Sequence, residues 1–271
     1  MNRISVVIPT YNREKVIKES IDSVLKQTLQ PIEIIVVDDF STDNTLQILK
    51  KYDNGTLKVI KNQFKKGANG ARNTGILFAE GDLIAFQDSD DTWDENKLQL
   101  QLEKLTSEDA DICFCSINTG DRKLPYRTLA SEEIYRQLRI RNFISTQSIL
   151  IKTAVAKKIM FDEELKRYQD WDFVLRASES FKIVHCPHAL VDIRIQTDSI
   201  TKKVNNMEAL FHLAKKHKEL LEEKPINPAL KYKLLMYSSY REKKIMKTGY
   251  YAIYYVFNKF YVDYILKLER L

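Results

Sequence analysis

Residues 32–43 read IEIIVVDDFSTD, a run of β-branched apolar residues that stops at two aspartates and a polar turn. A run this short and this continuously apolar predicts a strand buried on both faces of a sheet. The same pattern, an apolar run with a polar ending, occurs at residues 4–12 (ISVVIPTYN) and 83–91 (LIAFQDSDD). Helix-period segments at 16–24, 46–49, 71–79 and 98–105 alternate with these runs and with further apolar runs at 57–60 and 111–117. The alternation predicts an α/β fold with a mostly parallel, Rossmann-like sheet flanked by helices.

The composition is that of an ordinary globular protein. The 271 residues are 44% hydrophobic and 30% charged, which predicts a sizeable core and excludes a disordered or fibrous chain. The cysteines Cys113, Cys115 and Cys186 are too few for a disulfide framework and lack zinc-ligand spacing, so we expect a reducing compartment and buried thiols at Cys113 and Cys115. No apolar stretch approaches ~18 residues and the N-terminus lacks a signal-peptide core, so we expect a cytoplasmic protein.

Basic charge is concentrated at the C-terminal end of the chain. Residues 1–201 carry 28 Lys and Arg against 30 Asp and Glu, a net of −2, whereas residues 202–271 carry 15 against 7, a net of +8. Residues 202–271 also hold 9 of the 14 tyrosines. The two shifts predict a border at about residue 200, between a catalytic domain of residues 1–200 and a basic, tyrosine-rich helical region of residues 201–271.

The pattern of the C-terminal region predicts three helices, near residues 205–223, 228–247 and 250–270. Gly249 separates the last two. In the last helix, Lys259, Asp263 and Lys267 form one narrow polar stripe, and apolar and tyrosine side chains cover the rest. An apolar and aromatic helix face this wide must be covered by another surface. We favour the catalytic domain or a second copy of the chain, and an anionic membrane surface is the alternative.

Acidic residues gather where three of the predicted strands end. In such sheets ligands bind beyond the carboxyl ends of the strands, where this chain has Asp38-Asp39 and the segment Asp88-Ser89-Asp90-Asp91. Carboxylates held close together repel one another unless a cation compensates, and hard divalent cations prefer oxygen ligands. A divalent metal site is therefore one interpretation, and helix caps or turns are the other.

Residues 66–75, KGANGARNTG, hold three of the seven glycines ahead of a helix-period segment. Glycine allows close approach of the backbone, a helix start offers unpaired N–H groups, and Arg72 can bind phosphate through two donors. The segment predicts an anion-binding turn, although an ordinary loop with a solvated arginine has the same composition.

Taken in order, five segments resemble the inverting nucleotide-sugar glycosyltransferases of family 2, which have the GT-A fold. The matching segments are VVIPTYN at 6–12, VVDDFSTD at 36–43, GARNTG at 70–75, DSDD at 88–91 and YQDWD at 168–172. The resemblance covers residues 3 to about 200. It implies transfer of a sugar, with a UDP-sugar as the expected donor, to a hydroxyl group of a glycan or lipid-linked glycan in surface polysaccharide synthesis.

The resemblance also implies the roles of single residues. Donor contacts fall on Pro9, Thr10, Tyr11, Asn12, Asp39, Arg72, Asp88, Ser89 and Arg194. Asp90 and Asp88 would hold Mn²⁺ or Mg²⁺ against the diphosphate, with Asp91 as a further ligand or a supporting group. Asp170 would be the base that deprotonates the acceptor hydroxyl, while Asp172 is the rival base or a helix-start residue.

Two positions depart from the family pattern. Phe40 stands where the family usually has Gly, so the loop after Asp39 must either accommodate a bulky side chain or tolerate strain. Gln196 stands where many relatives have His, which weakens the expectation of a histidine ligand.

Other functions compete with transfer. A non-catalytic sugar or polyanion-binding module on a decayed transferase fold is the main rival, and a nucleotidyltransferase lacks support because no Gly-rich activating loop follows the first strand. We expect no nucleic-acid partner, because the lysines of the C-terminal region are interspersed with acids. If the last helix binds an anionic membrane surface, we expect the protein at the inner face of the membrane.

Overall fold

The computed structural model describes residues 3–52, 55–120, 122–125, 127–139, 141–194, 206–217, 232, 235–236 and 245–268. The chain forms two compact units. The first comprises Met1–Ile134, Asn142–Glu164 and Gln169–Thr197, and the second comprises Tyr135–Arg141, Leu165–Tyr168 and Asp198–Leu271. The first unit ends close to the predicted border at about residue 200, but the second also takes in two short segments of the predicted catalytic domain.

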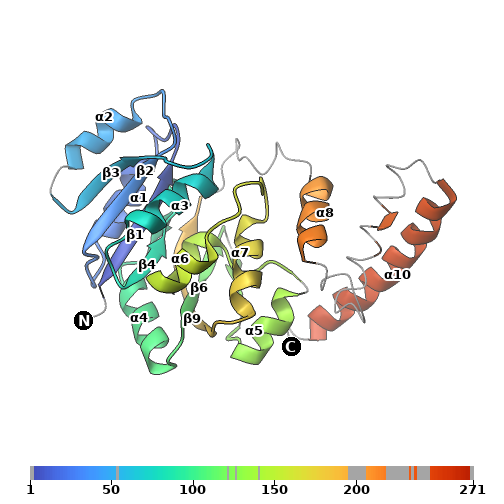
Figure 1. The fold of residues 1–271 in the computed structure, drawn as a ribbon. Helices are drawn as coiled ribbons and strands as arrows, with labels where there is room; N and C mark the ends of the chain where they lie inside the picture. The colour runs from blue at the N-terminus through green and yellow to red at the C-terminus, as the bar shows by residue number, and fades with distance from the viewer. Residues whose placement is uncertain are drawn as a thin grey trace. The chain divides into compact units, whose positions relative to one another are not determined.

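A single twisted sheet forms the centre of the first unit (Figure 1). Its strands are β1 (Ile4–Thr10), β2 (Glu33–Asp38), β3 (Leu57–Lys61), β4 (Leu83–Phe86), β5 (Thr92–Trp93), β6 (Ile112–Thr119), β7 (Arg122–Leu124), β8 (Ile149–Lys152) and β9 (Ile183–Ile193). Within the described residues these nine strands pair in the order β3-β2-β1-β4-β8-β6-β9-β5, with β7 beside β6. The predicted α/β fold with a mostly parallel sheet is confirmed.

The two halves of the sheet differ in strand direction. β3, β2, β1 and β4 are parallel, as the alternating pattern predicts. β8 then pairs antiparallel with both β4 and β6, and β6 pairs parallel with β9. After the β6–β7 hairpin and α5, β8 begins at the end of the sheet towards which β4 and β6 run, so it is antiparallel to both.

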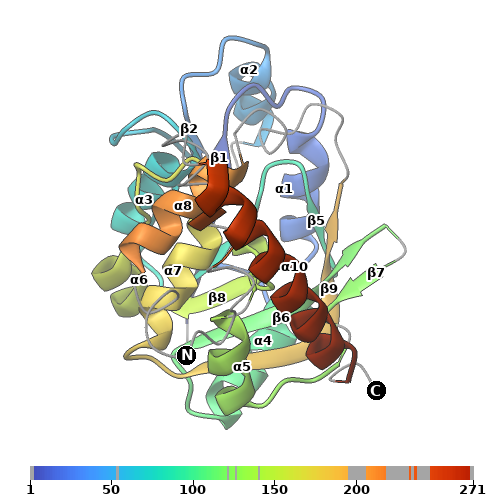
Figure 2. The ribbon, with the colours of Figure 1, turned by 90° about the vertical axis from the view of Figure 1, so that its right-hand side faces the viewer.

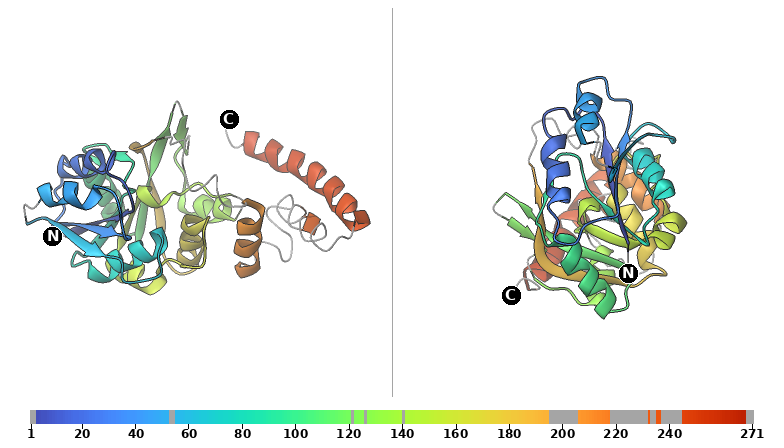
Figure 3. Two further views of the ribbon diagram at one scale, coloured as in Figure 1. Left: turned by 90° about the horizontal axis from the view of Figure 1, so that it is seen from above. Right: turned by 90° about the vertical axis from the view of Figure 1, so that its left-hand side faces the viewer.

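Helices cover both faces of this sheet. They are α1 (Ile17–Leu25), α2 (Thr45–Leu49), α3 (Ala68–Phe78), α4 (Lys97–Ser107), α5 (Ser131–Leu138), α6 (Thr153–Ile159) and α7 (Gln169–Ser178), with single 3₁₀ turns η1 (Lys50–Tyr52) and η2 (Thr146–Ser148). α1 and α4 lie on one face, and α3, α6 and α7 lie on the other (Figures 2 and 3). The sheet is therefore the middle of three layers, and its strands are apolar on both sides because both sides are covered.

Successive residues of β1 serve the two faces in turn. Val6 and Ile8 belong to the apolar cluster with α1 and α4, whereas Val7 points to α3. A Cβ atom added at Gly75 would lie 2.2 Å from Val7 Cγ1, so Gly75 lets α3 pack directly on β1. On the same face the Phe161 and Phe173 rings stack at 4.3 Å, and both rings contact Phe86 edge-on.

A lysine lies inside the core on the α4 side of the sheet. Lys97 is 0% exposed and its ammonium nitrogen has no hydrogen-bond partner in the part of the chain that is described. The nitrogen lies 3.8 Å from the centre of the Trp93 ring, which is its favourable contact. Burial lowers the pKa of Lys97 to about 8. The neighbouring Cys113 and Cys115 are free, buried thiols, as predicted.

The second unit contains α8 (Asn206–Lys216) and α10 (Ile245–Leu268). α10 runs through Gly249, so the predicted helix break there is wrong. A glycine inside a helix costs only about 1 kcal/mol, which the rest of a 24-residue helix outweighs. The predicted helix at 228–247 lies mostly outside the described residues. None of the helices that the structure describes combines the length and the apolar run that crossing a bilayer requires.

Candidate active site

The ends of β1 and β2 are joined into one rigid edge. The Asp39 backbone N–H donates to the Thr10 carbonyl at 2.8 Å. Beyond the strands, the Asn12 N–H donates to Ser41 Oγ at 3.0 Å, and Asn12 Oδ1 accepts from the Thr42 N–H at 2.8 Å. Of the predicted donor contacts here, Thr10 is buried and Tyr11 is 41% exposed, so Tyr11 offers its ring to solvent. Pro9 is buried within β1, and the amide of Asn12 ties two loops together.

Asp39 is buried and held from two sides. Its Oδ1 accepts from Asn62 Nδ2 at 2.6 Å, and its Oδ2 accepts from the Gly67 N–H at 2.9 Å. Asn62 also accepts from Thr74 Oγ1 at 3.0 Å, which connects the end of β3 to α3. The Gly67 N–H, one of the donors of the predicted anion-binding turn, is thus occupied by a carboxylate of the protein itself.

Arg72 is a buried arginine with only part of its guanidinium used. It is 4% exposed, and its Nη2 donates to Asp88 Oδ1 at 2.8 Å. Its Nε and Nη1 atoms are buried and have no hydrogen-bond partner within the described part of the chain. A buried donor without a partner costs about 1–3 kcal/mol, so the two free donors suit an oxygen-rich ligand.

The segment after β4 brings the predicted acidic cluster together. Burial and the charge of Asp88 raise the pKa of Asp90, and they raise the pKa of Asp91 to about 8. Asp90 is partly exposed and lies 3.8 Å from Arg13 Nη2. Asp91 is 4% exposed and accepts from Gln147 Nε2 at 2.8 Å and from the Arg194 N–H at 3.0 Å.

These contacts give the neighbouring aspartates different functions. The two oxygens of Asp91 accept hydrogen bonds from Gln147 in η2 and from Arg194 after β9. Asp91 therefore holds these two segments of the chain together. Ser89 is buried beside it. Asp88 and Asp90 are partly exposed and pair with Arg72 and Arg13, and helix capping does not account for either.

The start of α7 supplies the predicted base and its rival. Asp170 is partly exposed; burial raises its pKa, and it accepts from the Trp171 N–H at 2.8 Å and from the Asn142 side chain. The charges of Arg72 and Asp88 both act on it. Asp172 is 0% exposed and accepts from Arg176 at 2.8 and 2.9 Å, and Arg176 also donates to the carbonyls of Ile159 and Met160. Asp172 therefore fixes the end of α6 and is closed to an acceptor.

Asp88 is the residue around which the predicted site gathers. Its charge acts on Asp90 and Asp91 on one side and on Asp170 on the other, and its carboxylate holds Arg72. Arg194 joins through its backbone, while its guanidinium pairs with Glu19. Gln196 lies outside the described residues.

Sequence reasoning missed four polar residues of this region: Arg13, Asn62, Asn142 and Gln147. Arg13 lies three residues after β1 and Asn62 directly follows β3, so their place near the end of a strand was a usable signal. Asn142 and Gln147 lie in the connection before β8, where no pattern marks them.

The acidic cluster fits a cation that is shared with a substrate. Among the described residues, no group of three or more His, Cys, Asp and Glu side chains forms a complete metal cage. Asp88 and Asp90 remain as candidate carboxylate ligands, and both side chains are partly exposed. Two carboxylates are typical of Mg²⁺ sites in which substrate phosphates and water complete the coordination.

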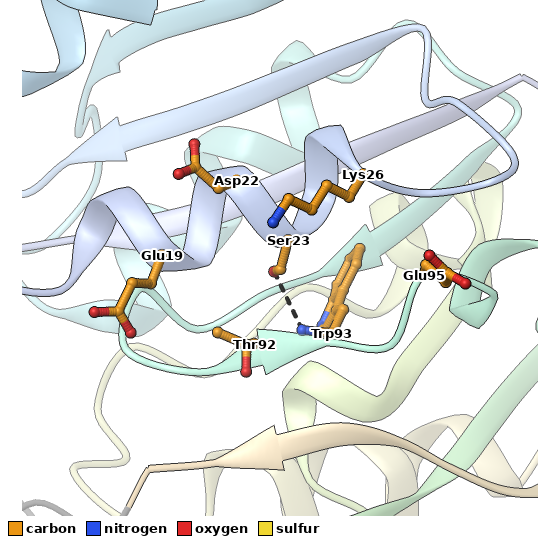
Figure 4. Close-up of a pocket in the computed structure, with 7 residues that line it drawn as sticks. All are labelled: Glu19, Asp22, Ser23, Lys26, Thr92, Trp93 and Glu95. Atoms are coloured by element: carbon orange, nitrogen blue, oxygen red, sulfur yellow. Dashed lines mark hydrogen bonds between the residues drawn. The ribbon is translucent and has the colours of Figure 1, made fainter.

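A separate surface hollow of about 440 Å³ lies between α1 and β5 (Figure 4). Glu19, Asp22, Lys26 and Trp93 are among its lining residues, and the Trp93 N–H donates to Ser23 Oγ at 3.1 Å. None of the predicted donor, metal or base residues lines this hollow, so it is not part of the candidate site.

Comparison with known proteins places the chain in a family. The family model described as Glycosyl transferase family 2 matches residues 5–162. The Escherichia coli protein UDP-Glc:alpha-D-GlcNAc-diphosphoundecaprenol beta-1,3-glucosyltransferase WfgD is 45% identical over 102 residues, which are 38% of this chain and 40% of WfgD. The putative colanic acid biosynthesis glycosyl transferase WcaA of E. coli K12 is 27% identical over 264 residues, 89% of each chain.

A solved structure resembles the chain over most of its length. The crystal structure of S. aureus TarS 1-349 in complex with UDP-GlcNAc has a TM-score of 0.68 and 26% identity, and the match covers 88% of this chain and 73% of the 1-349 chain. By contrast, the sequence matches to WfgD and to the related E. coli protein WfaP cover only 40% and 43% of those proteins.

Proposed function

The chain belongs to glycosyl transferase family 2, and from that membership we propose that it moves a sugar from a UDP-sugar to a hydroxyl group of a lipid-linked or polymeric glycan. The arrangement around Asp88 carries the proposal. One carboxylate interacts with Asp90, with Arg72 and with Asp170, so the groups suited to the departing diphosphate and to the attacking hydroxyl belong to one cluster.

Arg72 and the acidic cluster suit the leaving group. The free Nε and Nη1 donors of Arg72 would bind diphosphate oxygens, and their hydrogen bonds strengthen as charge develops on the leaving group. Asp88 and Asp90 would hold Mg²⁺ or Mn²⁺, which supplies positive charge beside the diphosphate. Asp39, Tyr11 and Thr10 lie at the neighbouring strand ends, where the base and ribose of the donor would be placed.

Asp170 would act as the general base for an inverting transfer. Burial raises its pKa, which makes it a stronger proton acceptor than an exposed aspartate, while the Asn142 amide and the charge of Arg72 favour its ionised form. Asp172 has no such role, because Arg176 occupies its carboxylate.

The proposed acceptor follows from the relatives. WfgD is named for a diphosphoundecaprenol-linked sugar acceptor, and the TarS of S. aureus strain Mu50 is named for poly(ribitol-phosphate). For this chain we propose an acceptor of the same two classes, used in surface polysaccharide synthesis on the cytoplasmic side of the membrane. The exposed aromatic residues of α10 and the net charge of +8 in residues 202–271 support contact with an anionic membrane surface.

The test separates donor binding from transfer. UDP-, GDP-, dTDP- and CDP-sugars are screened for a rise in melting temperature with Mn²⁺ or Mg²⁺ and with EDTA, because a ligand at 100 times its Kd stabilises by about 2.7 kcal/mol. The preferred donor is then used in a transfer assay with wild type and Asp170→Asn. We expect Asp170→Asn to keep the donor-induced shift and to lose transfer by about 10²–10⁴-fold. Near-normal transfer by this variant would refute the assignment of Asp170 as the general base. Donor binding that does not depend on metal would refute the proposed divalent cation.

A further inference from the structure

Phe40 adopts a backbone conformation that a bulky residue rarely adopts. Its φ is 67°, in the left-handed region, where the Cβ atom of any residue other than glycine meets its own backbone. Phe40 is 40% exposed, so burial of apolar surface offsets this strain only in part. Strain that packing offsets only in part, next to a candidate binding site, points to a function of the side chain.

The neighbouring residues enforce this conformation. The Ser41 N–H donates to both oxygens of Asp38, at 3.2 and 3.3 Å. Ser41 Oγ accepts from the Asn12 N–H at 3.0 Å, which fixes the far side of the turn to the loop after β1. Residue 40 lies between two anchored residues, Asp39 and Ser41, and its ring is projected at the rim of the sheet.

Phe40 and Tyr11 form a pair of similar features at the donor end of the sheet. Each ring is about 40% exposed, and each carries a lysine ammonium 4.7 Å from its centre, Lys61 over Phe40 and Lys66 over Tyr11. The two rings follow neighbouring parallel strands whose ends are hydrogen-bonded to each other. Aromatic faces bind nucleobases by stacking, and lysines beside them favour an anionic nucleotide.

We infer that Phe40 contacts the nucleobase of the donor, and that its strained conformation is kept because the ring strengthens donor binding. The inference rests on the proposed function, since it takes the ends of β1 and β2 as the donor site. It goes beyond that function in assigning donor affinity to a residue that stands where the family usually has glycine.

The experiment compares UDP binding with stability. Isothermal titration with UDP and with UMP is carried out on wild type, Phe40→Gly, Phe40→Leu and Phe40→Tyr, and melting temperatures are measured without ligand. Phe78→Ala is the matched control. Phe78 is 41% exposed, but it is the last residue of α3, at the end of the helix away from Gly67. GDP, CDP and dTDP are titrated into wild type as alternative bases.

We expect Phe40→Gly to melt at or a few degrees above wild type, since glycine relieves the strain. Its Kd for UDP and for UMP should rise about tenfold, in line with the loss of one base-stacking contact. Phe40→Leu should bind as weakly as Phe40→Gly but without the gain in melting temperature. Phe40→Tyr and Phe78→Ala should bind within about threefold of wild type.

The outcomes distinguish the inference from the proposed function. UDP binding by Phe40→Gly within twofold of wild type would overturn the inference and leave the donor site intact. Equal weakening by Phe40→Tyr would overturn it as well, because the aromatic face is then not what binds. A wild-type chain that binds none of the four nucleotides would overturn both the inference and the proposed donor.

Discussion

Replacing Lys97 by methionine should stabilise the protein. Lys97 is completely buried, its ammonium group has no hydrogen bond among the described residues, and burial lowers its pKa from 10.5 to about 8. That fall corresponds to a cost of about 3 kcal/mol for keeping the charged lysine in the core at neutral pH. Methionine has a similar length and volume and carries no charge.

The expected gain is smaller than the full cost. The variant also loses the contact of the ammonium with the Trp93 ring at 3.8 Å, which contributes about 0.5–2 kcal/mol. We therefore expect Lys97→Met to raise the free energy of unfolding by about 1–3 kcal/mol at pH 7. Urea unfolding of both proteins at the same pH measures it, and the midpoint should shift without a change in slope.

The pH dependence of the stability difference between wild type and Lys97→Met provides a second test. Between pH 8 and 10.5 the folded wild type binds fewer protons than the unfolded chain at Lys97, so its stability gains with rising pH from this residue. The advantage of Lys97→Met should therefore shrink as pH rises from 7 to 9.5. Lys104→Met on the same helix is the control, since Lys104 is 33% exposed and should change stability by about 0.5 kcal/mol or less. A Lys97→Met variant that is less stable than wild type, or a difference in stability that stays constant with pH, would show that the buried charge of Lys97 does not destabilise the protein.

Four further predictions concern the candidate site, the packing of α3 on β1 and the C-terminal helix. Burial raises the pKa of Asp170, so transfer should increase with pH through a value above the ordinary 3.8, and initial rates with a limb at or below pH 4 would contradict this. Asp172→Asn should cost about 3 kcal/mol in urea unfolding because it removes the charge partner of Arg176. Gly75→Ala should cost about 3 kcal/mol, because the added Cβ would lie only 2.2 Å from Val7 Cγ1, and wild-type stability would rule out that packing. The full chain should sediment with anionic vesicles and not with neutral ones, and deletion of residues 245–271 should abolish this.

The first half of the fold could be predicted from the sequence, because most of its strands and helices have a recognisable local pattern of apolar residues. The strands β1, β2 and β4 are buried on both sides, so their apolar runs are nearly continuous, and α1, α3 and α4 lie in the intervals between the predicted strands. β5 and β7 have only two and three residues, which is too short for a pattern. The reversed direction of β8 depends on the route of the chain between strands, which no local pattern records.

The candidate site was predictable where its residues follow strands. Asp39, Asp88 and Asp90 could be grouped because the ends of parallel strands meet at one edge of the sheet. The different role of Asp91 could not be predicted, since its partners Gln147 and Arg194 are 56 and 103 residues away in the sequence. The strain at Phe40 was expected as one of two outcomes, and the structure shows that the loop tolerates it.

The hydrogen bond from Arg194 to Asp91 sets an order of events during synthesis. A ribosome that adds 5–20 residues per second needs on the order of ten seconds to make the 103 residues between the two partners. Throughout that interval the first four strands can already pair, while the buried Asp91 carboxylate still lacks its backbone donor. The Asp91 part of the candidate site is therefore complete only after β9 has been made and has paired with β6.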